Sequence, residues 1–541
     1  MDAEAPELSL VTRPRPRAGL LPRLVVFAVW LGLVVFMAAN HAFWRDEVRA
    51  FSLATEPDSF PAMLRAIHGE GHPAIWYLLL RAANDLVGSP VVLGILAAAV
   101  GAASALILLF LSPFPLWLAT LFLASGALLF EYAVMARNYG ISVPLMFLFA
   151  YFYPRHRQRG VLLGVLLALL CNTNAHSVLL AGAFMLFWIL DMLAEQGLRW
   201  TPALRTLLLN GVIVAIGAAL CAATVYPPTQ DAAVVDPASL TLRRLLTAAI
   251  FPGSSFVQTT LRYPSLALGL PPISSYPAST GRKLASVLLF GSTLALIRLP
   301  TAFFVAVLSL IGLSLFFVVV YMGGYRHEAL WWVFLISLYW IAVARGRTAW
   351  PARSAFPPIR VLAGIGFACF LGLAALQVPF GVASVWRERP GGTPMSRVRD
   401  LAALIRSRPD LKDAIVVSDQ DHMLEALPYY VPNRTYFIRE NRFGTATRFT
   451  RKARLTIDLD DILQTARDLH RQYRAPVVIA MTAPLDPAAP EQTLEEGITF
   501  NLHTTQAQVR DFLAATDFLG RLAPAFWDET FDVYKLKDER P

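Results

Sequence analysis

Long apolar runs recur along this chain, and most are close to the length that crosses a lipid bilayer. A membrane-spanning helix needs about 20 apolar residues, with a working range of roughly 17–25. The stretch 160–194 is too long for one span and breaks at Asn172–His176, which predicts two short helices. We therefore expect a polytopic α-helical membrane protein with about eleven spans. The other nine predicted spans are 24–40, 91–111, 114–131, 138–153, 206–226, 284–299, 301–322, 329–344 and 358–380.

Composition supports this class and argues against nucleic-acid binding. Only 16% of the residues are charged, whereas a soluble protein carries about a quarter. The net charge of +9 comes from basic clusters between apolar runs, which is typical of topology signals. The three cysteines lie in apolar runs and predict core residues instead of disulfides or metal ligands. Arginines precede the first run, but no small-x-small site follows Met37, so we expect an uncleaved first span and no signal peptide.

One apolar segment, 72–88, decides the orientation. It is short and contains Arg81, Asn84 and Asp85. If it does not cross, the basic connectors all fall on one side, which the positive-inside rule identifies as the cytoplasm. We therefore expect a juxtamembrane or half-inserted helix and an outward C-terminus. The outer face then holds 41–90, 131–138, 227–283, 323–328 and everything after about residue 381.

The inner face keeps only the basic N-terminus, 1–23, and short loops, so it offers no room for a nucleotide-binding domain. No glycine-rich phosphate loop of the Walker type occurs either. An activated substrate must therefore reach the protein through the membrane or be present on the outer side.

The composition changes near Ser384, and we expect an extracytoplasmic α/β domain over 384–541 that follows a transmembrane domain over 24–383. Asp419–His422 follows the first expected strand. These residues suit a metal site or, more commonly, a cap and turn. The domain's expected strands are 414–418, 476–481 and 531–536, and its expected helices are 459–473 and 504–515.

Two polar sets follow the first span. Asp46 and Glu47 stand just outside it, either as a catalytic pair or as a solvated helix end. His68 and His72 flank a glutamate, a pattern that can indicate zinc. The neighbouring glycines and Pro73 argue against a helix there, so we favour a turn that begins the next helix.

Two further sets lie on the same predicted face. Arg137 has the planar donor fork that suits a phosphate, although a simple pairing with Glu131 is the alternative. Arg326 and His327 lie in a short loop between apolar spans and suit either interfacial anchoring or a second phosphate contact. Arg262, in the loop 227–283, is a weaker candidate.

Four motifs in this order resemble those of the GT-C glycosyltransferases. They are Trp44–Glu47, Gly71–Ala74, Ala136–Gly140 and, less surely, Tyr325–His327. The resemblance covers roughly residues 20–345. It is strongest to bacterial members similar to protein O-mannosyltransferases and lipid A aminoarabinose transferases. The chain departs from that pattern at two positions: Ala74 replaces the second proline of a His-Pro-Pro motif, and Asn138 stands where a bulky apolar residue is common.

The resemblance implies a polyprenyl-phosphate sugar donor and an acceptor on the outer face of a bacterial inner membrane. It implies no bound nucleotide and usually no essential metal, so we expect no cofactor. The sugar and the acceptor, whether a protein, lipid A or a cell-surface glycan, stay open.

On this basis the sequence predicts an inverting transfer. Asp46 is the expected base for the acceptor hydroxyl, and Glu47 is expected to orient the acceptor or tune Asp46. Arg137 is expected to hold the donor phosphate. Its expected helpers are Arg326 and His327, and the expected substrate-binding residues are His72, Glu131, Tyr139 and Arg262.

Two other classes of protein are alternatives. A lipid or sugar transporter often has internal repeats and broken helices near the middle of the membrane. The break at Asn172–His176 favours a transporter, but we find no convincing repeat. A non-catalytic scaffold would not need eleven spans.

Overall fold

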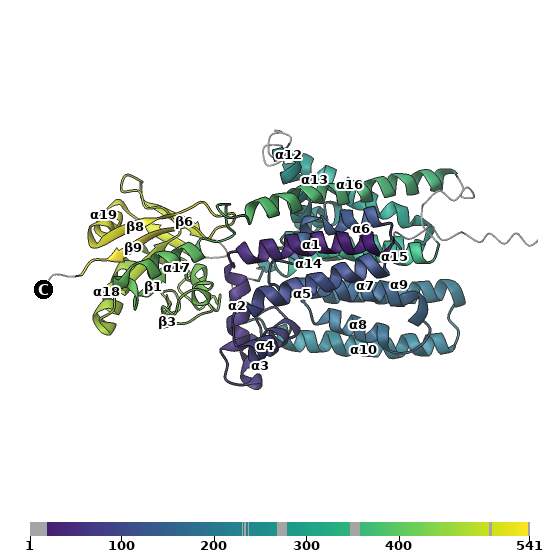
Figure 1. Ribbon diagram of the computed structural model, residues 1–541, viewed down its shortest axis with the longest axis horizontal. Coiled ribbons are helices and arrows are strands. Elements are labelled where there is room, and N and C mark those ends of the chain that lie inside the picture. Colours follow the sequence, from purple (N-terminus) through teal and green to yellow (C-terminus); the bar gives the residue numbers. More distant parts are fainter. Residues whose placement is uncertain are drawn as a thin grey trace, which may run out of the picture.

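The chain forms a body of long helices and, at one end of it, a smaller domain of strands and helices (Figure 1). The computed structural model describes residues 19–538 except 230, 232–233, 236, 268–277, 347–356 and 497–499. Helix α16 (Pro357–Arg387) runs from the body towards the smaller domain. The two parts therefore meet close to Ser384, where the composition changes.

Seven helices in the described part of the chain are long and apolar enough to cross a membrane. Helices suit this task because each satisfies its own backbone hydrogen bonds. Helix α15 is buried at the centre of the body, whereas α1 and α10 expose leucine and valine side chains that suit lipid. The chain is a multi-pass membrane protein. The seven helices are α1 (Leu20–Asn40), α5 with η1 (Val92–Leu111), α9 (Ser177–Gln196), α10 (Pro202–Val225), α14 (Pro300–Val319), α15 (Tyr325–Ala344) and α16.

The remaining apolar segments form shorter or interrupted helices, so the predicted count of about eleven spans is not confirmed. The loop 227–283 is also partly helical, with α11 (Leu242–Ile250) beside α14 and α12 (Ser254–Ala267) beside α16. The shorter helices of the body are α6 (Leu116–Leu123), η2 (Ala127–Glu131), η3 (Asn138–Ile141), α7 (Ser142–His156), α8 (Leu162–Cys171), α13 (Ala278–Thr293) and η6 (Leu294–Arg298).

Three short helices lie at the end of the body that faces the smaller domain (Figure 1). They are α2 (Arg45–Thr55), α3 (Phe60–Ile67) and α4 (Ile75–Val87). Helix α4 has 13 residues, fewer than a span needs, and packs against α2 and α5. It is the short helix that the sequence predicted within 72–88.

The C-terminal domain contains a four-stranded sheet in the order β1-β5-β9-β8. Strand β1 (Ile415–Ser418) pairs in parallel with β5 (Val477–Met481), and the other neighbours are antiparallel. Strands β1 and β5 are buried apolar runs, and α18 (Leu459–Tyr473) places one apolar face in the same core. The remaining elements of the two larger sheets and their helices are α17 (Val398–Ser407), β4 (Thr456–Asp458), β6 (Gln492–Glu496), β7 (Phe500–Thr504), α19 (Gln506–Ala515), β8 (Thr516–Leu522) and β9 (Phe531–Leu536).

The acidic residues after β1 stabilise a turn. Asp421 accepts hydrogen bonds from the backbone N–H groups of Ile438 and Arg439, at 2.8 and 2.9 Å. Asp419 accepts from the backbone N–H and the hydroxyl of Thr482. These contacts are those of the cap and turn that we favoured. No group of three or more His, Cys, Asp or Glu is arranged to hold a metal ion anywhere in the described residues.

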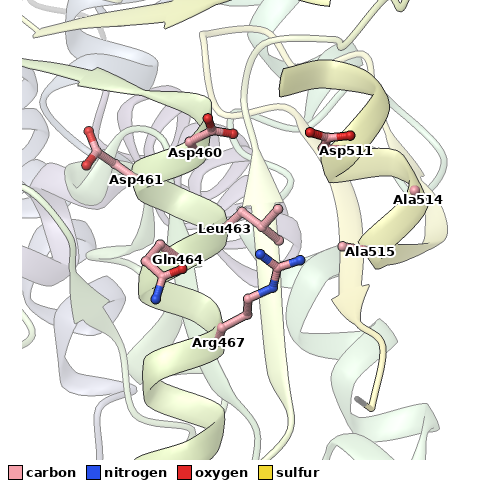
Figure 2. Close-up of a pocket in the computed structure, with 8 residues that line it drawn as sticks. All are labelled: Asp460, Asp461, Leu463, Gln464, Arg467, Asp511, Ala514 and Ala515. Atoms are coloured by element: carbon pink, nitrogen blue, oxygen red, sulfur yellow. The ribbon is translucent and has the colours of Figure 1, made fainter. Parts of the chain in front are cut away.

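A wide groove separates α18 from α19 on the C-terminal domain (Figure 2). Asp460 and Asp461 lie on one side of it and Asp511 on the other. Among the described residues, those that line the groove all belong to these two helices, so the groove is separate from the polar sets of the helical body.

Candidate active site

Glu47 is completely buried and joins three segments of the chain. It lies in the first turn of α2, where its carboxylate accepts hydrogen bonds from the backbone N–H of Trp44 at 2.9 Å and of Ala136 at 2.6 Å. The same carboxylate lies 3.0 Å from His41 Nε2. These contacts tie the end of α1 and the loop before Arg137 to α2. Glu47 does not line the cavity described below.

His41 extends this connection to the end of α16. Its two ring nitrogens lie 3.0 Å from Glu47 and 3.3 Å from Glu388. Burial alone would lower the pKa of His41, but the two carboxylates outweigh burial and raise the pKa to about 10. A protonated His41 therefore bridges two buried carboxylates at neutral pH.

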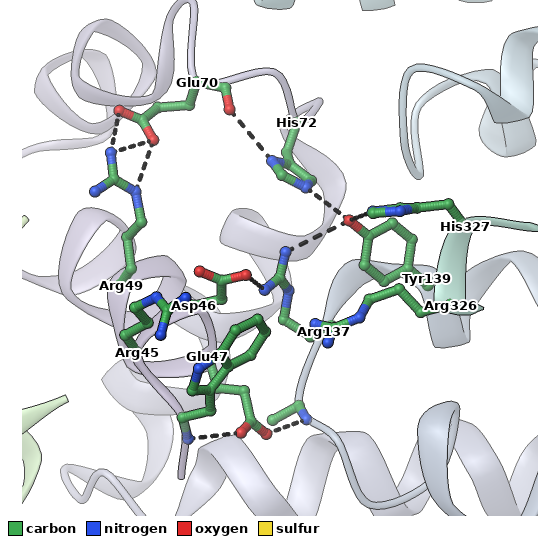
Figure 3. A network of polar contacts seen from close by, with 12 residues as sticks. Arg45, Asp46, Glu47, Arg49, Glu70, His72, Arg137, Tyr139, Arg326 and His327 are labelled. Atoms are coloured by element: carbon green, nitrogen blue, oxygen red, sulfur yellow. Dashed lines mark hydrogen bonds and ion pairs between the residues drawn. The ribbon is translucent and has the colours of Figure 1, made fainter. Parts of the chain in front are cut away.

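Asp46, the neighbour of Glu47, faces the opposite way and forms an ion pair with Arg137 (Figure 3). Burial favours the neutral acid, but the charges of Arg137, Arg45 and Arg326 outweigh it and hold the pKa of Asp46 well below its usual range. Asp46 is therefore ionised, and it is a weak base for as long as Arg137 holds it.

The Tyr139 hydroxyl lies at the centre of a hydrogen-bond network (Figure 3). It is 2.8 Å from His327 Nε2, 3.2 Å from His72 Nε2 and 3.4 Å from a guanidinium nitrogen of Arg137. His327 Nδ1 accepts from the Gly324 N–H, so its Nε2 carries the proton and donates to Tyr139.

The position of the proton on His72, at the other end of the network, follows from the same reasoning. His72 Nδ1 lies 3.3 Å from the carbonyl oxygen of Glu70, so Nδ1 donates and Nε2 accepts from the Tyr139 hydroxyl. Burial, together with the charge of Arg137, lowers the pKa of His72 to about 4. His72 is thus neutral, and both of its ring nitrogens are occupied within the protein.

Arg326 lies behind this network. Its guanidinium stacks over the Trp44 ring at 4.5 Å and lies 3.9 Å from the Glu131 carboxylate. The predicted alternative, a Glu131–Arg137 ion pair, is wrong because Arg137 pairs with Asp46 and Glu131 pairs with Arg326.

A cavity of about 240 Å³ lies between the helical body and the C-terminal domain. Asp46, His72 and Arg137 all line it, so three residues from separate predicted sets share one space. The other lining residues are Arg45, Arg49, Ala50, Glu70, Trp76, Tyr77, Asn138, His422 and Phe449.

Sequence reasoning missed the charged residues that join the two domains beside this cavity. Arg49 forms a bidentate pair with Glu70, at 2.8–3.0 Å, and reaches Glu425 of the C-terminal domain at 2.5 Å. Arg45 pairs with Asp528 at 2.8 Å. The spacing of Arg45 and Arg49, one helical turn apart after the first span, was the available signal.

The structure does not bring Arg262 into this arrangement. Its side chain is exposed on α12 and shares no hydrogen bond or ion pair with the cavity residues that the structure describes. Four other predicted residues do not line the cavity. Tyr139 contacts the lining residues His72 and Arg137 from behind, His327 contacts Tyr139, and Arg326 pairs with Glu131.

The break between α8 and α9 lies against the same cluster. Asn138, which lines the cavity, donates to the carbonyl of Thr173 at 2.6 Å, and the ring of His176 stacks on Tyr139 at 5.8 Å. The break therefore supports the loop that carries Arg137 and Tyr139.

Comparison with known proteins adds little to this geometry. No family model and no curated protein matches the chain. Two crystal structures of ArnT from Cupriavidus metallidurans are similar. The one bound to undecaprenyl phosphate has a TM-score of 0.46 and 15% identity, over 89% of this chain and 97% of that chain. The apo form has a TM-score of 0.44 and 14% identity, over 88% and 97%. Both TM-scores are below 0.5, so neither similarity assigns a fold or an activity to this chain.

Proposed function

We propose that this protein is an inverting glycosyltransferase that moves a sugar from a polyprenyl-phosphate donor to an acceptor hydroxyl, with the cavity on the outer face of a bacterial inner membrane. The observation that carries the proposal is the pairing of Asp46 with Arg137 inside a cavity at one end of the helical body. A carboxylate and a phosphate-binding group are the two parts that such a transfer needs.

Arg137 is the proposed phosphate-binding residue. Its guanidinium offers parallel N–H donors that match phosphate oxygens. Tyr139 accepts a hydrogen bond from it, and Arg326 adds positive charge nearby, since both arginines act on the Asp46 carboxylate. These groups would stabilise the negative charge that grows on the phosphate as the lipid leaves.

Asp46 is the proposed general base. The acceptor oxygen bonds to the anomeric carbon, the bond from that carbon to the phosphate oxygen breaks, and the hydroxyl proton moves to the Asp46 carboxylate. Polyprenyl phosphate leaves, and a single displacement inverts the anomeric carbon.

Because Asp46 is paired with Arg137, it becomes an effective base only after the donor phosphate binds Arg137. When the donor phosphate takes over the guanidinium of Arg137, Asp46 loses its strongest positive partner, and its pKa rises towards the ordinary range. Donor binding therefore creates the base that the acceptor needs. Glu47, buried and fully engaged, is a positioning residue in this mechanism.

The test is mass spectrometry of envelope lipids, glycans and glycoproteins from cells with the wild-type protein, without it, and with Asp46→Asn. The expected result is one glycosylated species that requires the protein and is missing from Asp46→Asn cells. Asp58→Asn, an exposed aspartate at the same end of the body, is the matched control and should keep the product.

Two outcomes would contradict the proposal. Normal product in Asp46→Asn cells would remove Asp46 as the base. Redistribution of a lipid-linked sugar across the membrane, with no new glycosidic bond, would instead favour the transporter.

A further inference from the structure

His422 of the C-terminal domain lines the same cavity as Asp46 and Arg137. It lies in the short helix η8 (Asp421–Leu424) that follows β1, and only 2% of the residue is exposed. Its Nδ1 atom is buried and has no hydrogen-bond partner among the described residues. An unpaired buried polar atom costs about 1–3 kcal/mol, and at the wall of a cavity a bound ligand is one way in which that cost is offset.

Neighbouring residues fix the position of His422 without bonding to its Nδ1 atom. Its ring packs against Phe449 at 5.2 Å and Phe500 at 5.8 Å. The preceding residue, Asp421, is fixed by two backbone hydrogen bonds, and the following residue, Met423, accepts a contact from Arg45 at 3.3 Å. The imidazole is thus oriented from both sides.

The imidazole is neutral. Burial, followed by the positive charge of Arg45, lowers the pKa of His422 to about 3. A neutral imidazole carries one N–H donor and one acceptor nitrogen, a combination that suits a hydroxyl group, which also donates and accepts.

Phe449 is a second unusual residue in the same wall. Its φ of +41° is in the left-handed region, which is a genuine outlier for a bulky residue. Strain of this kind costs on the order of 1–3 kcal/mol and persists where the surrounding structure imposes it. Here it accompanies a ring that lines the cavity beside His422 and Arg49.

The position of this wall indicates which substrate it meets. Under the proposed function, the donor's lipid chain stays in the membrane and its phosphate binds Arg137, on the helical body. An inverting displacement requires the acceptor to approach from the side opposite the leaving phosphate. Among the described residues that line the cavity, only His422 and Phe449 come from the C-terminal domain. They form the wall that faces the helical body.

We propose that this wall is the acceptor-binding side of the cavity, with His422 hydrogen-bonding an acceptor hydroxyl and Phe449 packing against the acceptor's apolar face. This inference rests on the proposed function. It assigns to the C-terminal domain a direct part in choosing the hydroxyl that is glycosylated.

The experiment uses the full-length protein in nanodiscs, with His422→Phe compared with wild type. Undecaprenyl phosphate serves as the donor-side binding probe. Undecaprenyl-phosphate mannose and undecaprenyl-phosphate aminoarabinose serve as donors. Lipopolysaccharide, a serine- and threonine-rich peptide and a soluble cell-wall glycan serve as acceptors. For the pair that the wild type uses, KM is measured for donor and acceptor separately.

His422→Phe should raise KM for the acceptor tenfold or more and leave undecaprenyl phosphate affinity within twofold of wild type. His422→Gln, which keeps a donor and an acceptor, should recover part of the loss. His503→Phe, the same change at a partly exposed histidine on β7, is the matched control and should match wild type. Phe449→Leu provides a second variant, expected to raise acceptor KM by a smaller factor, should His422→Phe fail to fold.

The failures are distinguishable. Wild-type protein that transfers neither sugar to any acceptor argues against the proposed function, and the inference falls with it. Wild-type transfer with an unchanged acceptor KM in His422→Phe, or with a changed donor affinity, overturns the inference alone.

Discussion

The two walls of the cavity differ in how fully their ionisable side chains are paired, although the Trp76 indole N–H on the helical body is also buried without a partner in the described residues. On the helical body, Asp46 and Arg137 neutralise each other, and both ring nitrogens of His72 have partners. On the C-terminal domain, the Nδ1 of His422 has no partner within the described chain. Ionisable groups that already pair with each other must exchange partners to bind a ligand, whereas the unpaired Nδ1 of His422 gains a bond without losing one. The difference predicts that a ligand of Arg137 competes with Asp46, whereas a ligand of His422 displaces no protein group.

The largest expected effect breaks the paired wall at Asp46. Asp46→Asn should lower the rate of transfer by about 10²–10⁴-fold, the usual contribution of a positioned base. It should also increase affinity for undecaprenyl phosphate, because Arg137 is no longer held by a carboxylate. Binding and single-turnover measurements on the same nanodisc sample test both effects. Weaker lipid binding in Asp46→Asn would mean that Asp46 does not compete with the phosphate.

Removing the other member of the pair tests the donor side. Arg137→Ala should weaken undecaprenyl phosphate binding by roughly 10–100-fold, since hydrogen bonds to charged groups contribute about 1.5–3 kcal/mol. Arg345→Ala is a control for loss of a partly buried arginine ion pair away from the cavity, because Arg345 follows the C-terminal end of α15 and pairs with Asp191 at 2.6 Å. Unchanged lipid affinity in Arg137→Ala would place the phosphate elsewhere.

The contacts of His41 with Glu47 and Glu388, behind the helical-body wall, make the stability of the protein depend on pH. The pKa of His41 is raised from 6.5 to about 10 in the folded protein, so its protonated form stabilises the fold. That stabilisation is complete below about pH 6.5 and is lost as the pH rises through about 10. The thermal unfolding temperature of the wild type should therefore fall between pH 7 and 10, and it should fall less in His41→Gln. An equal decline in both proteins would assign the effect to other groups.

The smallest expected effect concerns Tyr139. Tyr139→Phe removes the hydroxyl that joins His72, His327 and Arg137 but keeps the ring. A loss of about 1 kcal/mol, or roughly fivefold in donor affinity, is expected for a hydrogen bond to a well-oriented partner. Titration with undecaprenyl phosphate measures it. A loss as large as that of Arg137→Ala would show that Tyr139 contacts the phosphate itself.

Sequence reasoning located most of the helical-body wall and little of the C-terminal wall. The elements 459–473 and 531–536 were predicted with their observed bounds, because amphipathic and buried patterns are local properties. The strands β6, β7 and β8 were missed. Strand β8 is largely exposed or half-buried and shows no regular alternation, so its formation depends on pairing with β9. His422 was noticed only as a possible metal ligand, since its place in the cavity depends on how the C-terminal domain docks onto α2.

The chain alone determined that long apolar helices form, because their length and composition match a bilayer without reference to any partner. It also determined which residue types gather near the ends of those helices. The resemblance implied Asp46 as the base, and only the tertiary structure decided which of Asp46 and Glu47 faces the cavity. Successive residues on a helix point about 100° apart, so one carboxylate faces the cavity and Arg137 while its neighbour is buried against Ala136 and His41. Which of the two meets the cavity depends on what packs around α2, and adjacent positions in a sequence do not contain that information.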